Sequence, residues 1–217
     1  MSSPSFLARL RQLPADPALP PQLLQTRQWD GPLCRVRLDN TGSSPEAVRH
    51  WRLFEGDLGL APDAAIYGEG FQMLAQTMGS WQAPEPVGRC PDAGVYRITE
   101  DDGYHTVHNL LLVACEGGWL LLAFASCQRF GGEFRLYPDG RLEIVMNAEG
   151  RTLAPDQHWQ SEALICLEGP DREALLATLA QHIAAEHGSL VGEVPTRPSG
   201  WCSWYHYYAD VSAADIR

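Results

Sequence analysis

Several titratable side chains are of types that could hold a metal ion or act as an acid–base pair. His105 and His108 are three residues apart in a segment that predicts a strand, and odd spacing on a strand sends two side chains to opposite faces. Two ligands of one metal must converge, so this pair does not predict a metal site. Asp101 and Asp102 precede Gly103 and are typical of a solvated turn, not of paired catalytic carboxylates.

The cysteines suggest a second chemistry, nucleophilic catalysis. Cys202 and His206 are of the types of a nucleophile and its base, but no other segment resembles a cysteine hydrolase, and a small side chain packed on a strand is the interpretation we favour. The six cysteines form no CxxC pair, which argues against a zinc knuckle or a thioredoxin-type site. Residues 1–24 hold no apolar signal core. Scattered cysteines are then typical of small buried side chains in a reducing compartment, and we expect a cytoplasmic protein.

Composition indicates an ordered globular protein. Apolar residues make up 45% of the 217 residues and charged residues 20%, which excludes an intrinsically disordered chain. The net charge of -11 argues against nucleic acid or an anionic membrane as the main partner, because both require clustered cations. No apolar run approaches the roughly 18 residues of a membrane span.

The elements that must position any site are predicted to be mainly strands. In residues 34–39, apolar and charged residues alternate, which is the pattern of a half-buried strand. Residues 106–115 and 119–127 predict a hairpin through Glu116-Gly117-Gly118. Other strands are expected at 48–54, 131–137, 141–147 and 158–167, with turns at Pro138-Asp139-Gly140 and Glu149-Gly150. This pattern favours a large antiparallel β-sandwich.

The C-terminal part of the sequence changes character. Residues 171–187 have apolar residues at helical spacing, with Pro170 before and Gly188 after them, and predict a linking helix. A linker follows, and residues 199–208 are rich in aromatic residues and are interpreted as a strand. We expect an N-terminal β-sandwich domain over 1–190, and over 191–217 a linker with the first βα element of a truncated second domain, because half a βα unit cannot bury both of its faces.

The string from Gly200 to Tyr208, followed by Asp210-Val211-Ser212, resembles the first barrel strand of the family 36 glycoside hydrolases, the α-galactosidases and their raffinose-synthase-like relatives. Gly68-Glu69-Gly70-Phe71-Gln72 resembles a stretch of that family's N-terminal sandwich, which belongs to the supersandwich type. The resemblance implies a catalytic (β/α)8 barrel after the sandwich and a retaining double displacement by two carboxylates on α-galactoside oligosaccharides. It implies no metal or organic cofactor, and an oligomeric full-length protein. Both family carboxylates lie on later barrel strands, so no catalytic residue is named in this chain.

By the same resemblance, three aromatic residues are candidates for substrate binding. Trp204 and Tyr205 are expected at the C-terminal end of the first barrel strand, where an indole can stack on a sugar ring and a phenol can donate a hydrogen bond. Trp81, in a segment that suggests a loop, is expected to reach out of its own domain to the mouth of the barrel. For all three, packing in a core or an interface is the alternative.

Two function classes follow. The first is the N-terminal part of an α-galactosidase-like glycoside hydrolase, inactive by itself. The alternative is a stand-alone carbohydrate-binding β-sandwich module, and a purely structural oligomerisation domain is a third possibility.

Overall fold

The computed structural model describes residues 5–14, 16–72, 74–88, 103–187, 200, 202 and 204–216. The chain divides into two compact units, residues 1–187, here called the β unit, and residues 188–217, here called the C-terminal unit. The expected turn at Asp101-Asp102 and the expected linker before residue 199 lie outside the described residues. In the part of the chain described, no helix is both long and apolar enough to cross a membrane.

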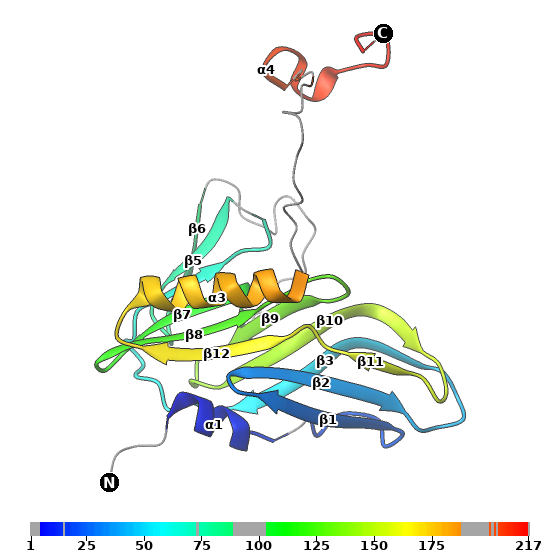
Figure 1. Cartoon of the computed structure of the whole chain (residues 1–217), viewed down its shortest axis with the longest axis vertical. Helices are drawn as coiled ribbons and strands as arrows, with labels where there is room; N and C mark the ends of the chain where they lie inside the picture. The colour runs from blue at the N-terminus through cyan, green and yellow to red at the C-terminus, as the bar shows by residue number, and fades with distance from the viewer. Residues whose placement is uncertain are drawn as a thin grey trace. The chain divides into compact units, whose positions relative to one another are not determined.

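The β unit is mainly β (Figure 1). Its helices are α1 (Phe6–Gln12) and α3 (Arg172–His187). Its strands are β1 (Leu23–Asp30), β2 (Leu33–Asn40), β3 (Glu46–Gly56), β4 (Ile66–Glu69), β5 (Ala75–Gly79), β6 (Pro84–Gly88), β7 (His105–Cys115), β8 (Gly118–Phe124), β9 (Gly131–Leu136), β10 (Leu142–Leu153), β11 (His158–Gln160) and β12 (Leu164–Gly169).

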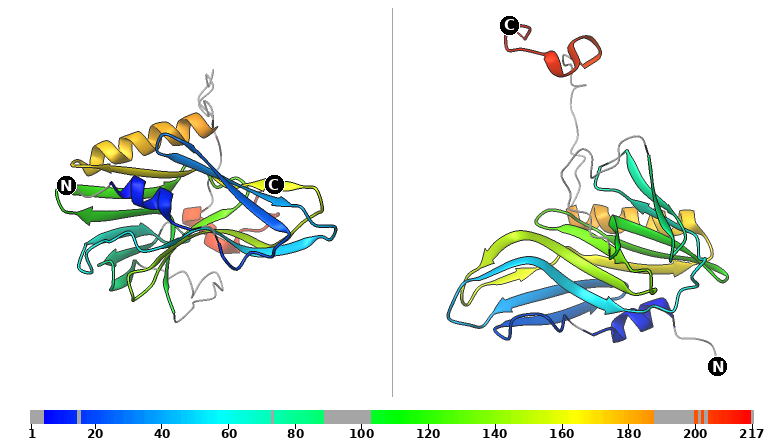
Figure 2. Two further views of the ribbon diagram at one scale, coloured as in Figure 1. Left: turned by 90° about the horizontal axis from the view of Figure 1, so that it is seen from below. Right: turned by 180° about the vertical axis from the view of Figure 1, so that it is seen from behind.

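The strands form one antiparallel sheet that branches at β7. One path runs β1-β2-β12-β8-β7-β4-β5-β6, and a branch runs β7-β9-β10-β3. Residues Leu110–Cys115 of β7 pair with β8, whereas His105–His108 pair with β9. Between these two halves the pairing with β4 shifts register, and Asn109 has φ 55°. This irregularity bends β7, so that the sheet curls and encloses a core (Figure 2).

Period-2 patterning accounts for β1, β2 and β4, whereas β8 and β9 are buried along most of their length. In β2, Cys34, Val36 and Leu38 are fully buried while the alternate residues face outward. The hairpin expected at residues 106–127 is confirmed, with Gly117 at φ 80° in the two-residue turn. Phe124 and Phe134 stack at 5.3 Å between ring centroids inside the core.

The helix expected over residues 171–187 is confirmed as α3. Asp171 caps its first turn, because its Oδ1 accepts hydrogen bonds from the backbone N–H of Glu173 at 2.9 Å and of Ala174 at 3.4 Å. Leu175 and Leu179 pack on the outer face of the sheet. The sheet residues beneath them are Leu112, Leu121, Ala123 and Ile165.

Two expectations about local structure are wrong. The turn expected at Glu149-Gly150 lies inside β10, where both residues have positive φ and the pairing with β3 shifts register between Asn147 and Arg151. Glu149 and Gly150, which favour a turn, thus form a β-bulge within the strand. The strand expected at 158–167 is interrupted between β11 and β12, at residues 161–163. Ser161 N still donates to Val36 O at 2.8 Å, while Ser161 Oγ accepts from Val36 N at 2.9 Å and donates to Glu162 O at 2.8 Å.

Among the described residues of the C-terminal unit, the expected barrel strand is not seen. The described residues of this stretch form a helical turn, α4 (Trp204–Tyr207), and a 3-10 turn, η1 (Tyr208–Asp210). A strand needs a paired neighbour to satisfy its backbone groups, whereas a turn satisfies them locally and lets Trp204 and Tyr208 meet edge to face at 5.6 Å. Ser212 then closes a turn on Asp215, whose Oδ2 accepts from Ser212 N at 2.9 Å.

Candidate functional site

Trp81 does not reach out of its domain, contrary to the sequence prediction. Its side chain is 1% exposed and belongs to the main core cluster. The indole N–H donates to the backbone oxygen of Gly140 at 3.2 Å, so burial leaves no polar atom of the ring unpaired. The segment is a tight turn between β5 and β6, and its backbone is tied to residues 62–64. Trp81 thus has a packing role in this structure.

Trp204 and Tyr205 lie in the C-terminal unit with their side chains in solvent. Trp204 is 58% exposed and Tyr205 is 86% exposed. The neighbouring Tyr208, against which Trp204 packs, is also 58% exposed. These rings therefore have faces free for a sugar or for a protein surface, and Trp81 belongs to the other unit.

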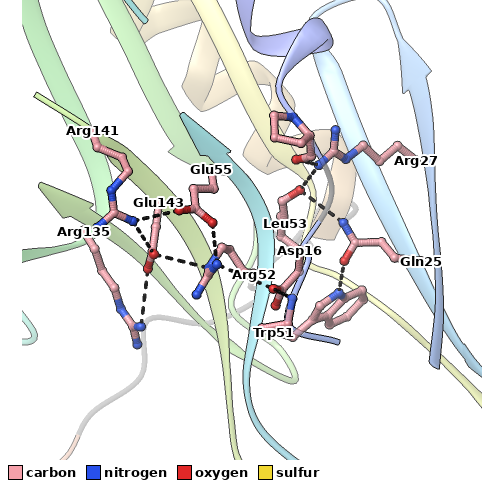
Figure 3. A network of polar contacts seen from close by, with 12 residues as sticks. Asp16, Gln25, Arg27, Trp51, Arg52, Leu53, Glu55, Arg135, Arg141 and Glu143 are labelled. Atoms are coloured by element: carbon pink, nitrogen blue, oxygen red, sulfur yellow. Dashed lines mark hydrogen bonds and ion pairs between the residues drawn. The ribbon is translucent and has the colours of Figure 1, made fainter. Parts of the chain in front are cut away.

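A dense group of charges lies on the outer face of β3, β9 and β10 (Figure 3). Cross-strand pairing places Glu143 of β10 opposite Glu55 of β3 and opposite Arg135 of β9. Two carboxylates directly opposite one another would repel. Arg52 and Arg141 lie between them and contact both.

Glu143 is the centre of this group, here called the Glu143 network, and is 2% exposed. Arg141 Nη1 donates to Glu143 Oε1 at 2.9 Å, and Arg52 Nε lies 3.3 Å from the same oxygen. The other oxygen, Oε2, lies 3.8 Å from Arg135 Nη1, which is too far for a hydrogen bond. Among the residues described, Oε2 has no hydrogen-bond partner. The network extends to Asp16, whose Oδ1 lies 3.5 Å from Arg52 Nη1.

Two tyrosines flank the network. The guanidinium of Arg141 lies 3.5 Å from the ring centroid of Tyr137, and the rings of Tyr137 and Tyr104 are 5.3 Å apart. Burial, together with the negative charge of Glu143, raises the pKa of Tyr137 to about 12. The phenol is therefore neutral at physiological pH.

A second set of polar contacts in Figure 3 joins β1 to β3 without strand pairing. Leu53 sits at a register shift in β3, and its carbonyl accepts hydrogen bonds from Arg27 and from Gln25 Nε2, the latter at 3.2 Å. Gln25 Oε1 accepts from Trp51 Nε1 at 2.8 Å. Arg27 also donates to the carbonyls of residues 13 and 14. These side chains link β1, at one end of the main path, to β3, at the end of the branch.

The Glu143 network is suited to holding strands together and not to catalysis. A reacting carboxyl must reach its substrate, and Glu143 is enclosed by arginines from β3 and β9 and from the turn before β10. Removing one partner of such a buried ion pair typically costs about 3–5 kcal/mol. Sequence reasoning missed the network, although Glu133-Phe134-Arg135 and Arg141-Leu142-Glu143 place opposite charges two residues apart on one strand face.

Among the described residues, the requirements of a metal site are not met, and those of a nucleophilic cysteine are not met by Cys34 or Cys166. No group of three or more His, Cys, Asp or Glu side chains there could hold a metal ion. Cys34 and Cys166 are buried, and burial raises the pKa of each thiol to about 12, which makes both poor nucleophiles. Cys202 is exposed. No model of a known protein family matches the chain.

Proposed function

We propose that this chain is the N-terminal part of a retaining glycoside hydrolase that acts on α-galactosides. In this proposal the β unit is a β-sandwich of the supersandwich type that supports a catalytic (β/α)8 barrel. The C-terminal unit supplies the first element of the barrel, and the catalytic carboxylates belong to later barrel strands. The chain by itself is then inactive.

The main observation in favour of this proposal is the exposure of aromatic side chains in the C-terminal unit. Tyr205 at 86% and Trp204 at 58% exposure present more aromatic surface to water than side chains of their size usually do. Both ring types stack on sugar rings, and both pack well in protein interfaces. The resemblance of residues 200–208 to a family 36 barrel strand favours the sugar. The order of elements, a curled antiparallel sheet followed by a helix and the aromatic segment, agrees with it.

Trp81 is no longer part of the proposed substrate site, because its ring is buried in the β unit. The proposed site residues are Trp204 and Tyr205, with Trp204 stacking on the sugar and Tyr205 donating a hydrogen bond to it. The helical turn seen here would have to become a strand within the complete barrel, where neighbouring strands satisfy the backbone.

Hydrolysis of a chromogenic α-galactoside tests this function. The 217-residue chain and the full product of the gene are assayed side by side, and we expect activity in the longer protein only. Inactivity of a folded longer protein would contradict the proposal.

Substitution of the aromatic residues tests the proposed site. In the longer protein, Trp204→Ala should lower kcat/KM by up to about tenfold, because stacking contributes about 0.5–1.5 kcal/mol beyond the area it buries and about 1.4 kcal/mol is a factor of ten. The matched control is Tyr67→Ala, which removes a 41% exposed ring from the β unit and should leave kcat/KM unchanged. Equal effects of the two substitutions would count against a substrate role for Trp204.

A further inference from the structure

The β unit has a pocket of about 530 Å³ on the strands β1, β2 and β11 that none of the roles described so far uses. It is lined by Gln28, Trp29, Asp30, Arg35 and Gln160. Pockets that bind small molecules typically measure about 300–1,000 Å³, so this volume is sufficient for a small ligand.

Strand register brings the polar lining residues to one face. Gln28 of β1 pairs with Arg35 of β2, so their side chains are neighbours on the same side. Gln160 of β11 pairs with Arg37, which lies two residues along β2 on that side. The indole of Trp29 packs instead against the core, 5.9 Å from the Phe54 ring. The pocket therefore has a polar lining without an aromatic platform.

The polar groups at the pocket are free to bind. Among the residues that the structure describes, the side chains of Gln28, Asp30 and Gln160 have no hydrogen-bond or ion-pair partner. Arg35 is held in place by an ion pair with Glu186 at the end of α3, and this pair occupies only one of its two terminal nitrogens. Two amides, a carboxylate and a guanidinium edge thus combine several unpaired donors and acceptors in one pocket.

The charges at this site indicate a neutral ligand. Glu186 balances the charge of Arg35. Arg11, whose guanidinium lies 4.9 Å from the Trp29 ring centroid and donates to Gly31 O, offsets the charge of Asp30, so the site has no excess positive charge that would favour phosphates or carboxylates. Asp30 is the only carboxylate among the lining residues, and the nearby Glu186 is engaged by Arg35, which leaves too few carboxylates for a divalent cation. Adjacent hydroxyl groups, each both a donor and an acceptor, fit amides and a carboxylate well.

We propose that this pocket binds a neutral carbohydrate through hydrogen bonds from Gln28, Asp30, Arg35 and Gln160. The site belongs to the β unit and is independent of the proposed hydrolase function. Because each hydrogen bond in an open, hydrated pocket adds little net free energy, the expected dissociation constant is on the order of 1 mM.

The test is a titration of the 217-residue chain with galactose and with melibiose, followed by amide chemical shifts. Sugar up to about 50 mM would saturate a site of this affinity. We expect saturable shifts of the side-chain amides of Gln28 and Gln160. Inorganic phosphate serves as the anionic comparison and should cause none.

The double variant Gln28→Ala/Gln160→Ala should raise the dissociation constant at least about tenfold. Gln157→Ala is the matched control, since Gln157 is an exposed glutamine just before β11 that does not line the pocket. Unchanged backbone shifts elsewhere would show that both variants fold.

Three outcomes would overturn the proposal: no saturable shift, saturation by phosphate in place of sugar, or equal weakening in the control. Sugar-dependent shifts confined to Trp204 and Tyr205 would also overturn it, while supporting the hydrolase site. Inactivity of the longer gene product would leave this pocket's proposal unaffected.

Discussion

At the residue scale, Tyr137 links the Glu143 network to a measurable pH dependence. Its pKa in the folded chain is about 12, whereas a tyrosine in an unfolded chain titrates near 10. Because the folded pKa is raised, the stability that Tyr137 contributes is fully present below pH 10 and is lost as pH rises through 12. We expect the urea midpoint of the wild type to fall over this range.

The sequence removes one competing titration from this test, that of lysine side chains, while Cys34 and Cys166 share the pKa of about 12 and stay unchanged in the comparison with Tyr137→Phe. All 16 basic residues are arginines and the chain contains no lysine, so no lysine ammonium groups titrate between pH 10 and 12. Tyrosinate absorbance, which thiolates do not share, should show a component near pH 12 that is missing in Tyr137→Phe. The midpoint of that variant should also fall less steeply. A Tyr137→Phe titration identical to the wild type would refute the assignment.

At the scale of elements, the two glycines at the start of β9 differ in what their positions tolerate. A Cβ atom on Gly132 would lie 2.1 Å from Cδ2 of Phe124, whose ring stacks on Phe134. A Cβ atom on Gly131 would come no closer than 4.0 Å to Asn147 Cβ. Gly132→Ala should therefore lower the free energy of unfolding by about 1–3 kcal/mol, and Gly131→Ala by no more than about 0.5 kcal/mol. Urea unfolding measures both, and equal midpoints would show that Phe124 moves aside freely.

Elements with strong local signals were predictable from sequence, and those that depend on distant partners were not. The hairpin of β7 and β8 has two apolar runs joined by a two-residue turn, and α3 has a cap and helical spacing. Strand β6 contains Pro84 and Pro86, which argue against a strand unless it is an edge strand such as this one.

The candidate site was less predictable than the fold for the same reason. Trp81 lies among loop-forming residues, and only the packing of β5 and β6 buries its ring. The Glu143 network joins residues from 16 to 143, and its contacts depend on strand register. The helical turn at Trp204 forms where the sequence favoured a strand, because the choice depends on neighbouring strands.

At the scale of the whole molecule, the β unit should fold by itself when residues 188–217 are deleted. Its core is assembled from side chains of residues 10–166, and α3 covers the apolar outer face formed by β7, β8 and β12. Residues 1–187 should therefore show one cooperative urea transition and a β-type circular dichroism spectrum. A further truncation to residues 1–170 removes α3 and uncovers Leu121 and Ile165, so it should bind a hydrophobic dye and aggregate. A gradual urea unfolding transition of the fragment 1–187 would show that the β unit does not fold by itself. Equal dye binding by the fragments 1–187 and 1–170 would show the same.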